Sequence, residues 1–174
     1  MPGSDTEALE QATQSPVGSE APVGQAVSGC PKPCKSSCPK APSKGEYEGL
    51  RGKTPSDGIQ KAVNSKNPKT CGACGNVVAS LAADHIVSLK IMSQMPGFAC
   101  LSKEDQADVA NSPRNFMGLC GPCNSSKCAK TWHRWKGIKG KAEVAADVRA
   151  AARQQTNQQL KELKAKVREK PCKK

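Results

Sequence analysis

The chain has 174 residues, of which 3% are aromatic, 13 are proline and 15 are glycine. This length and composition exclude two large independent hydrophobic cores and favour one small domain with appendages. Lys and Arg number 27 against 15 Asp and Glu, a net charge of +12, so we expect a polyanionic partner, nucleic acid first and a membrane surface second. No run of about 18 apolar residues occurs and no apolar segment follows a basic start, so neither a transmembrane helix nor a cleavable signal peptide is predicted.

The N-terminal region, residues 1–45, is rich in Pro, Ser, Gly, Ala and Gln and shows no helical or strand periodicity. Such a composition predicts a disordered, largely irregular linker or tail. Cys30, Cys34 and Cys38 lie within it at the spacing of one helical face, but the intervening prolines would break a helix. A second metal clip, a disulfide and free thiols therefore all stay open for these three cysteines.

Short elements are predicted through the middle of the chain. Residues 46–70 are polar and basic and predict a lead-in with one short helix around residues 59–63. Residues 77–87 are apolar and β-branched enough to predict a short hairpin that ends in an Asp-His pair. The stretch 102–110 predicts a small helix, because Ser102 can cap its first turn. Together these elements predict a small α+β fold.

Two further helices are predicted toward the C-terminus. Three polar side chains can cap a helix over residues 127–136, and two glycines after it can end it. Residues 141–170 carry a thin apolar stripe at helical spacing, which predicts a long basic helix that packs lightly or docks a partner. We accordingly divide the chain into a tail (1–45), a basic lead-in (46–70), a core (71–140) and a basic C-terminal helix (141–174).

Two CxxC pairs separated by 45 residues supply four thiolates, enough for a tetrahedral zinc shell: Cys71, Cys74, Cys120 and Cys123. Small or turn-forming residues flank the pairs in CGACG and CGPCN, which lets backbone amides approach the sulfurs. A closed four-cysteine shell leaves no open position for catalysis, so the zinc is predicted to be structural, and ligating thiols favour a reducing working compartment. One disulfide pair or reactive thiols are the alternative.

The segments ADHIVSL and NFMGLCGPCNSSK, beside the first CxxC pair, resemble the HNH nuclease family over residues 71–136. The resemblance implies a ββα-metal (His-Me finger) core, in which a hairpin, a loop and a helix surround one divalent ion. By position, His85 would be the general base that activates water and Asp84 a ligand of the catalytic metal. Asn115 would orient His85 through a hydrogen bond. Asn124 takes the last place of the motif, where many members have His, so the chain resembles the HNN variant and its metal preference stays open.

The chemistry of these side chains agrees with the reaction that the resemblance implies. An imidazole with its ordinary pKa of about 6.5 accepts a proton at neutral pH. Carboxylate and amide oxygens suit Mg²⁺ or Mn²⁺ as a catalytic ion that keeps several waters. The last predicted helix of the core would hold backbone phosphates without reading bases, through Lys127, Lys130, Arg134 and Lys136, with His133 as either a phosphate contact or a packing residue.

These features predict a metal-dependent endonuclease that hydrolyses DNA, with RNA less favoured, at little sequence specificity. A non-catalytic zinc-dependent nucleic-acid-binding module is the main alternative, and a disulfide-bonded secreted scaffold is a third. The tail, compact core and basic helix resemble the nuclease modules of bacterial polymorphic toxins and secretion-system effectors. That resemblance implies a cytoplasmic site of action, delivery by a secretion system and an acidic immunity protein as partner. A phage, mobile-element or restriction enzyme is the rival.

Overall fold

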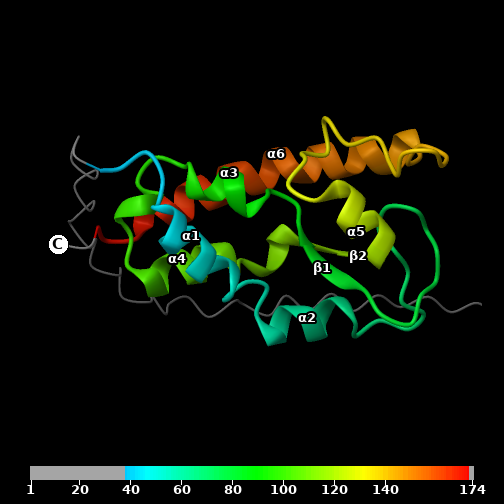
Figure 1. Ribbon diagram of the computed structural model, residues 1–174, viewed down its shortest axis with the longest axis horizontal. Coiled ribbons are helices and arrows are strands. Elements are labelled where there is room, and N and C mark those ends of the chain that lie inside the picture. Colours follow the sequence, from blue (N-terminus) through cyan, green and yellow to red (C-terminus); the bar gives the residue numbers. More distant parts are fainter. Residues whose placement is uncertain (1–37, 173–174) are drawn as a thin grey trace, which may run out of the picture.

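A two-stranded antiparallel sheet and a long C-terminal helix organise a small mixed α+β fold (Figure 1). The structure is a computed structural model that describes residues 38–172. The strands are β1 (Ala82–His85) and β2 (Phe116–Leu119). Around them lie the helices α1 (Lys44–Arg51), α2 (Asp57–Val63), α3 (Leu89–Ser93), α4 (Lys103–Ala110), α5 (Gly121–Lys127) and α6 (Ala146–Glu169), with short 3-10 turns at Phe98–Cys100 and Pro113–Asn115.

The two strands pair across a long connection rather than through a tight turn. Ala82 lies opposite Leu119, and His85 lies opposite Phe116. The side chain of Leu81, just before β1, packs against Gly118, where a Cβ atom would lie 2.8 Å from its Cδ1. The prediction of a hairpin within residues 77–87 was therefore wrong, because β1 finds its partner thirty residues downstream and strand pairing is not a local property of sequence.

Helix α2 covers the open edge of β1 with two amide side chains. Gln60 accepts a hydrogen bond from the N–H of Ala83 at 3.0 Å and donates one to the carbonyl of Leu81 at 2.6 Å. Asn64 accepts from the N–H of Leu81 and donates to its carbonyl, both at 2.9 Å. These contacts satisfy backbone groups that an edge strand otherwise leaves unpaired. The short helix predicted around residues 59–63 is confirmed and has this function in the fold.

The connection between the strands builds one hydrophobic cluster. Its helix α4 begins as predicted after Ser102, whose hydroxyl accepts a hydrogen bond from the N–H of Asp105 at 3.0 Å. The apolar faces of this segment pack on each other, on Leu50 of α1 and on the end of α6. The cluster members that are completely buried are Val87, Met92, Phe98, Leu101, Val109 and Ala110. This packing fixes the loop after β1, which carries Asn115.

Helix α5 begins directly after β2 and is short. Pro122 stands in its first turn, where a missing N–H costs nothing, and the helix ends at Lys127, followed by Cys128, which has a positive φ of 47°. The predicted helix over residues 127–136 was wrong, because α5 precedes it and residues 128–145 are not helical. Trp132 and Trp135 of this segment are buried, pack edge-to-face and contact α5, because Trp135 donates a hydrogen bond to Ser126 at 3.1 Å and Trp132 lies against the ammonium of Lys127.

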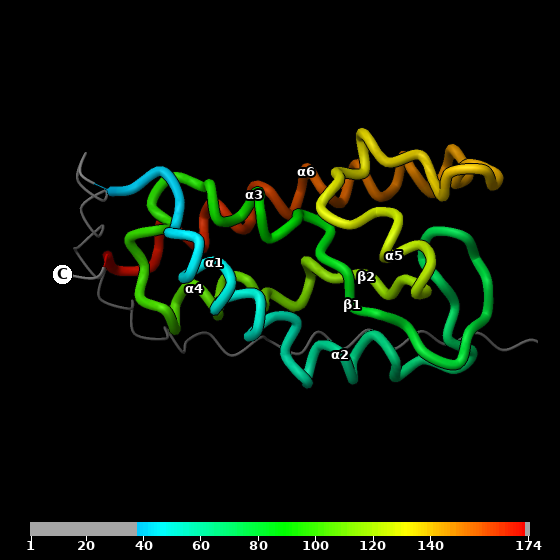
Figure 2. Tube along the Cα trace, viewed as in Figure 1, coloured from blue at the N-terminus to red at the C-terminus, as the bar shows by residue number. Residues whose placement is uncertain are grey.

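Helix α6 runs along most of the length of the molecule (Figure 2). Ala152 belongs to a cluster with the two tryptophans and three cysteines of the CxxC pairs, whereas Leu163 and Val167 belong to the cluster of the connection. The predicted long helix is confirmed, but its apolar stripe packs on both clusters rather than lightly. Within residues 38–172, no helix is both long enough and apolar enough to cross a lipid bilayer.

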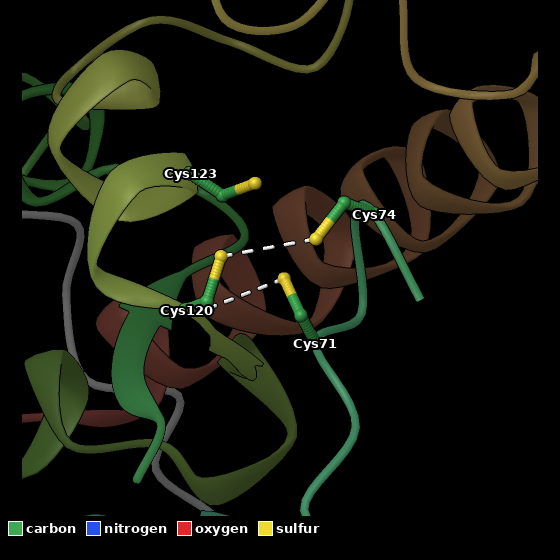
Figure 3. Close-up of side chains that lie close together, drawn as sticks. All are labelled: Cys71, Cys74, Cys120 and Cys123. Carbon is green, nitrogen blue, oxygen red and sulfur yellow. Dashed lines mark hydrogen bonds between the residues drawn. The ribbon is translucent and has the colours of Figure 1, made fainter. Parts of the chain in front are cut away.

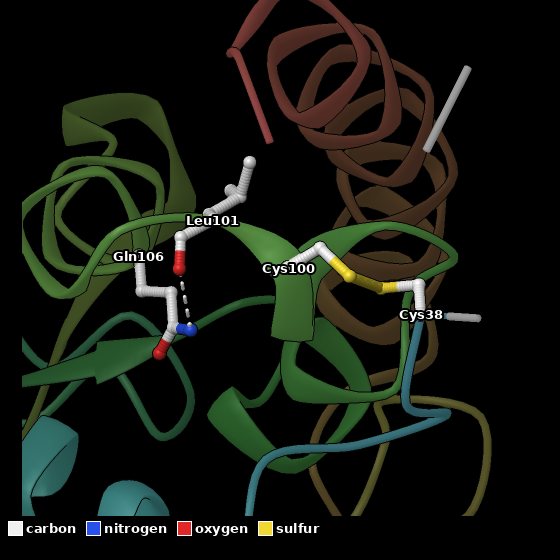
Figure 4. Close-up of a disulfide and its surroundings, with 4 residues drawn as sticks. All are labelled: Cys38, Cys100, Leu101 and Gln106. Carbon is white, nitrogen blue, oxygen red and sulfur yellow. Dashed lines mark hydrogen bonds between the residues drawn. A yellow bond between two sulfur atoms is a disulfide. The ribbon is translucent and has the colours of Figure 1, made fainter. Parts of the chain in front are cut away.

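A disulfide joins the start of the described chain to the connection. Cys38 is bonded to Cys100, 62 residues away, next to the turn that Gln106 closes on Leu101 (Figure 4). Cys172 is also disulfide-bonded. For Cys38 the open question is thus answered by a disulfide, while Cys30 and Cys34 lie outside the described residues. Disulfides persist in oxidising environments, so these disulfide-bonded cysteines disagree with the predicted reducing compartment.

Candidate functional site

The two CxxC pairs form one cluster of four thiols. Ligand atoms of Cys71, Cys74, Cys120 and Cys123 all lie within 4.8 Å of one another, and their sulfurs point toward a common centre (Figure 3). The sulfurs of Cys74 and Cys120 are 3.8 Å apart. A tetrahedral zinc shell with Zn–S bonds of about 2.3 Å places its sulfurs about 3.8 Å apart. The cluster is therefore close enough to hold a metal ion and is consistent with a zinc site.

Local backbone geometry brings the first pair of thiols together. The N–H of Gly75 donates to the carbonyl of Cys71 at 2.9 Å, and Gly75 has a φ of 72°, a conformation that suits glycine. The N–H of Gly72 donates to the carbonyl of Gly118 at 2.9 Å, which fastens this turn to β2. The N–H of Cys120 then donates to the sulfur of Cys71 at 3.2 Å. The predicted close approach of backbone amides to the sulfurs is confirmed.

Burial and neighbouring N–H donors shift the thiol pKa values of the cluster in opposite directions. Burial raises the pKa of Cys71, but N–H donors from Cys120, Cys74 and Ala73 lower it more, to about 7. Burial raises the pKa of Cys123 and of Cys74, and the nearby thiols contribute further. Four thiols at this spacing cannot all ionise unless a cation compensates their charge. Cys128, which is exposed, stands outside the cluster.

A second site lies between β1, α5 and α1. Asp84, His85 and Asn124 line one cavity of about 430 Å³, a size typical of pockets that hold small ligands. Asp84 and His85 come from the end of β1, and Asn124 comes from the middle of α5. The side-chain amide of Asn124 makes no hydrogen bond within the described residues. Three of the four residues predicted for catalysis thus share one cavity.

His85 is held through one ring nitrogen. Its Nε2 lies 3.1 Å from the carbonyl oxygen of Ala110 and 3.1 Å from Oγ1 of Thr54. Because a carbonyl oxygen only accepts, Nε2 carries the proton and Nδ1 keeps its lone pair. Burial lowers the pKa of His85 to about 4; the bond to Ala110 opposes this shift and the charge of Lys127 adds to it. The imidazole is therefore neutral at pH 7.

Asp84 forms a buried ion pair with Lys127. The Nζ atom of Lys127 lies 2.5 Å from Oδ2 of Asp84, and the two side chains are 1% and 9% exposed. Nζ also donates to the carbonyl of His85 at 3.2 Å and lies 5.7 Å from the ring centroid of Trp132. Oδ2 has no further hydrogen-bond partner within the described residues. Burial raises the pKa of Asp84, and the charge of Lys127 opposes that shift.

The burial of Lys127 corrects one prediction. A side chain that is completely buried cannot contact a phosphate, so its expected place on a nucleic-acid surface was wrong. The cation–π contact with Trp132 and the ion pair with Asp84 stabilise the lysine in this buried position. The other predicted basic residues of this segment are exposed, and none of them lines the cavity: Lys130, His133, Arg134 and Lys136. Lys130 donates to the carbonyl of Ser126, and Lys136 lies 3.8 Å from Glu143.

Asn115 lies beneath the site rather than in it. Its side chain is fully buried, accepts from the N–H of Val87 at 2.8 Å and donates to the carbonyl of Val87 at 3.1 Å. Its own carbonyl accepts from the N–H of Ile86 at 2.8 Å. These bonds hold the backbone that follows His85, and none of them reaches the imidazole. The imidazole is oriented by Thr54 and Ala110, residues that the sequence pattern did not single out.

Residues of the basic lead-in form another wall of the cavity. Tyr47 and Arg51 from α1 line it, together with Thr54. No chemistry was predicted for residues 46–70, because no motif marks them, and only the net positive charge of the segment was a signal.

Comparison of the chain with protein-family models, with curated proteins and with solved structures finds no match.

Proposed function

We propose that the chain is a metal-dependent endonuclease of the HNH type, in its HNN variant, that hydrolyses DNA phosphodiester bonds with little sequence specificity. The observation that carries this proposal is the cavity that Asp84, His85 and Asn124 share. The order β1, β2, α5 supports a ββα-metal core, since the two strands pair and the helix follows at once. RNA is the less favoured substrate.

A structural zinc ion at the four cysteines is the first metal of this proposal. The cluster joins the turn that carries Cys71 and Cys74 to the start of α5, the helix that supplies Asn124 to the cavity. Four thiolates close the zinc shell and leave no position for a substrate. The zinc would thus hold this turn against α5 and take no part in the reaction.

A catalytic Mg²⁺ or Mn²⁺ ion is the second metal. Asp84 and Asn124 offer a carboxylate and an amide oxygen to one cavity, which is the hard-oxygen donor set of these ions. Lys127 engages Oδ2 of Asp84, so the other carboxylate oxygen is the one we expect to bind the ion. When bound, such an ion neutralises charge on the phosphate and on the leaving oxygen.

His85 would act as the general base. Because Nε2 donates to Ala110, Nδ1 is the atom that can take a proton from water. The low pKa keeps the ring unprotonated at neutral pH and also makes it a weak base, so a divalent ion held by Asp84 and Asn124 would have to supply the charge that acidifies the attacking water. Asn115 supports this arrangement by fixing the backbone at Val87, and the exposed basic residues after α5 would hold the DNA backbone.

Plasmid digestion tests the proposal. Zinc-loaded protein should convert supercoiled DNA with added Mg²⁺ or Mn²⁺ and should fail with EDTA added after zinc loading. His85→Ala should abolish conversion while keeping the zinc content and the circular dichroism spectrum of the wild type. Cleavage by the His85→Ala variant at the wild-type rate would refute the proposed general base.

A zinc-dependent nucleic-acid-binding module without catalysis is the second candidate, and the ion pair between Asp84 and Lys127 favours it. A carboxylate that is 9% exposed and bound to a lysine has a structural role already. Under this alternative the wild type binds DNA but does not cleave it with any divalent ion, and His85→Ala leaves binding unchanged. Digestion and binding measured on the same two proteins separate the candidates.

The biological role that we propose is that of an antibacterial effector module neutralised by an acidic immunity protein, with a phage, mobile-element or restriction enzyme as the alternative. The net charge of +12 supports a carboxylate-rich partner. Expression in the bacterial cytoplasm should stop growth with the wild-type chain and not with His85→Ala. Equal growth of the two strains at equal protein levels would refute the toxin role but not the proposed nuclease activity, which the plasmid digestion tests separately.

A further inference from the structure

Helix α1 contributes one cationic side chain, Arg51, to the lining of the cavity. The catalytic roles proposed for Asp84, His85 and Asn124 give this side chain no function. We propose that Arg51 binds the phosphate group of the substrate in the cavity that Asp84 and Asn124 also line. The inference rests on the proposed function, because it names the part of the cavity that recognises the substrate's anion. It is carried by the lining of the cavity, in which Arg51 and Asp84 occur together.

The backbone that carries Arg51 is fixed on both sides. On its N-terminal side, Ser43 caps α1 in a capping box with Glu46, and Leu50, 4% exposed, anchors the helix in the hydrophobic cluster. On its C-terminal side, the carbonyl of Lys53 accepts a hydrogen bond from Asn111 at 2.9 Å. Thr54 then contacts Nε2 of His85 at 3.1 Å. The guanidinium therefore extends from a well-fixed backbone, three residues before Thr54, which contacts the proposed catalytic imidazole.

The charge of Arg51 is not used elsewhere in the described structure. Arg149, by contrast, pairs with Glu143 at 3.0 Å, and Arg114 lies 3.9 Å from Glu162. Arg51 has no ion-pair partner within residues 38–172 and is exposed. The one carboxylate that lines the cavity, Asp84, is already paired with Lys127. An exposed cation beside a neutralised carboxylate makes this cavity attractive to an anion.

The chemistry of a guanidinium matches a phosphodiester. Its planar fork presents parallel N–H donors to two non-bridging phosphate oxygens, which an ammonium cannot reproduce. Tyr47, one turn earlier on α1, also lines the cavity and can offer a hydroxyl. A phosphate bound by Arg51 would face the carboxylate and amide wall, which is where a divalent ion would have to meet it. This arrangement gives α1 a function in substrate binding rather than only in packing.

The test compares Arg51→Gln, Arg51→Lys and the matched control Lys61→Gln, which removes an exposed positive charge from α2 outside the cavity. Each is measured as the zinc-loaded full chain, for plasmid cleavage and, with the His85→Ala change added, for binding of a fluorescein-labelled DNA duplex. We expect Arg51→Gln to lower kcat/KM on the order of 10- to 100-fold, as for loss of a charge-assisted hydrogen bond. Arg51→Lys should recover part of the loss, and Lys61→Gln should change it by less than about 3-fold.

The two readouts separate this inference from the proposed function. If the wild type cleaves DNA and Arg51→Gln behaves like Lys61→Gln in both assays, the role of Arg51 is refuted and the nuclease stands. If the wild type does not cleave DNA but Arg51→Gln weakens binding more than Lys61→Gln does, the nuclease fails and the phosphate site stands. If the wild type neither cleaves nor binds DNA, both are overturned. Zinc content and the thermal unfolding midpoint of each variant exclude misfolding as the cause of a loss.

Discussion

The buried ion pair between Lys127 and Asp84 makes a quantitative prediction about stability. At 2.5 Å and an effective dielectric constant of about 20, the attraction between the two charges is roughly 7 kcal/mol, and much of it offsets the cost of burying them. Lys127→Met keeps the unbranched shape beside Trp132 but removes the charge. Asp84 would then be a buried carboxylate without its cation. We expect the free energy of unfolding to fall by about 3–5 kcal/mol.

Urea denaturation at pH 7 of zinc-loaded protein with intact disulfides measures this effect. Adding Asp84→Asn to Lys127→Met removes the uncompensated charge, so the double variant should recover most of the loss. Lys136→Met is the matched control, because Lys136 and Glu143 are 69% and 60% exposed, and we expect it to cost less than about 1 kcal/mol. The reasoning would be refuted if the free energy of unfolding of Lys127→Met lay within about 1 kcal/mol of that of the wild type. It would also be refuted if the double variant were less stable than Lys127→Met.

The same pair predicts a pH dependence whose sign follows from linkage. Burial raises the pKa of Asp84, and Lys127 holds that rise back. Without Lys127 the folded-state pKa of Asp84 rises further, so the folded variant binds a proton that the unfolded chain has already released. Its stability is then greatest below the unfolded pKa of about 3.8 and falls as the pH rises. The difference between Lys127→Met and the wild type should therefore be larger at pH 7 than at pH 4.

Three further predictions concern the metal cluster, His85 and the disulfide. The wild type should bind one equivalent of zinc by elemental analysis and Cys71→Ser should lose it, while Cys128→Ser, at a cysteine outside the cluster, should keep it. Burial lowers the folded-state pKa of His85 from 6.5 to about 4, so its contribution to stability is complete above pH 6.5 and is lost as the pH falls toward 4. Urea denaturation at several pH values between 4 and 6.5 should show this loss in the wild type and a smaller loss in His85→Gln. If the free energy of unfolding changes equally with pH in both proteins, the burial of the imidazole is contradicted. Replacing both Cys38 and Cys100 with Ser should lower the free energy of unfolding by about 4 kcal/mol, the chain-entropy value for a loop of 62 residues, again with Cys128→Ser as the unaffected control. A loss below about 1 kcal/mol would mean that the unfolded chain is already constrained there.

Local chemistry made several elements predictable from the sequence. The two CxxC pairs indicated one four-thiol cluster, because zinc ligation needs that donor set and little else. The start of α4 was predictable because the Ser102 cap is formed within one turn of the chain. The short helix α2 was predicted from the polar, punctuated stretch that contains it, although its N-cap residue, Ser56, makes no side-chain capping hydrogen bond. The common cavity of Asp84, His85 and Asn124 followed from their resemblance to a known motif, not from local propensity.

Packing over long distances in the sequence decided the rest. The pairing of β1 with β2 depends on the thirty residues between them, which fold into their own hydrophobic cluster. Lys127 became a buried partner of Asp84 because α5 begins six residues before the position predicted for it, which turns the lysine inward. Arg51 reached the cavity because α1 docks on α4 and the connection.

Sequence alone therefore determined which groups could ligate metals and which could accept or donate protons, since these properties belong to the side chains themselves. Tertiary structure alone decided which of those groups face the cavity, which are neutralised by a neighbour and which second wall completes the site. The physical reason is that charge and hydrogen-bonding capacity are intrinsic to a residue. Burial and pairing, in contrast, depend on elements that are distant in the chain and meet only when it folds.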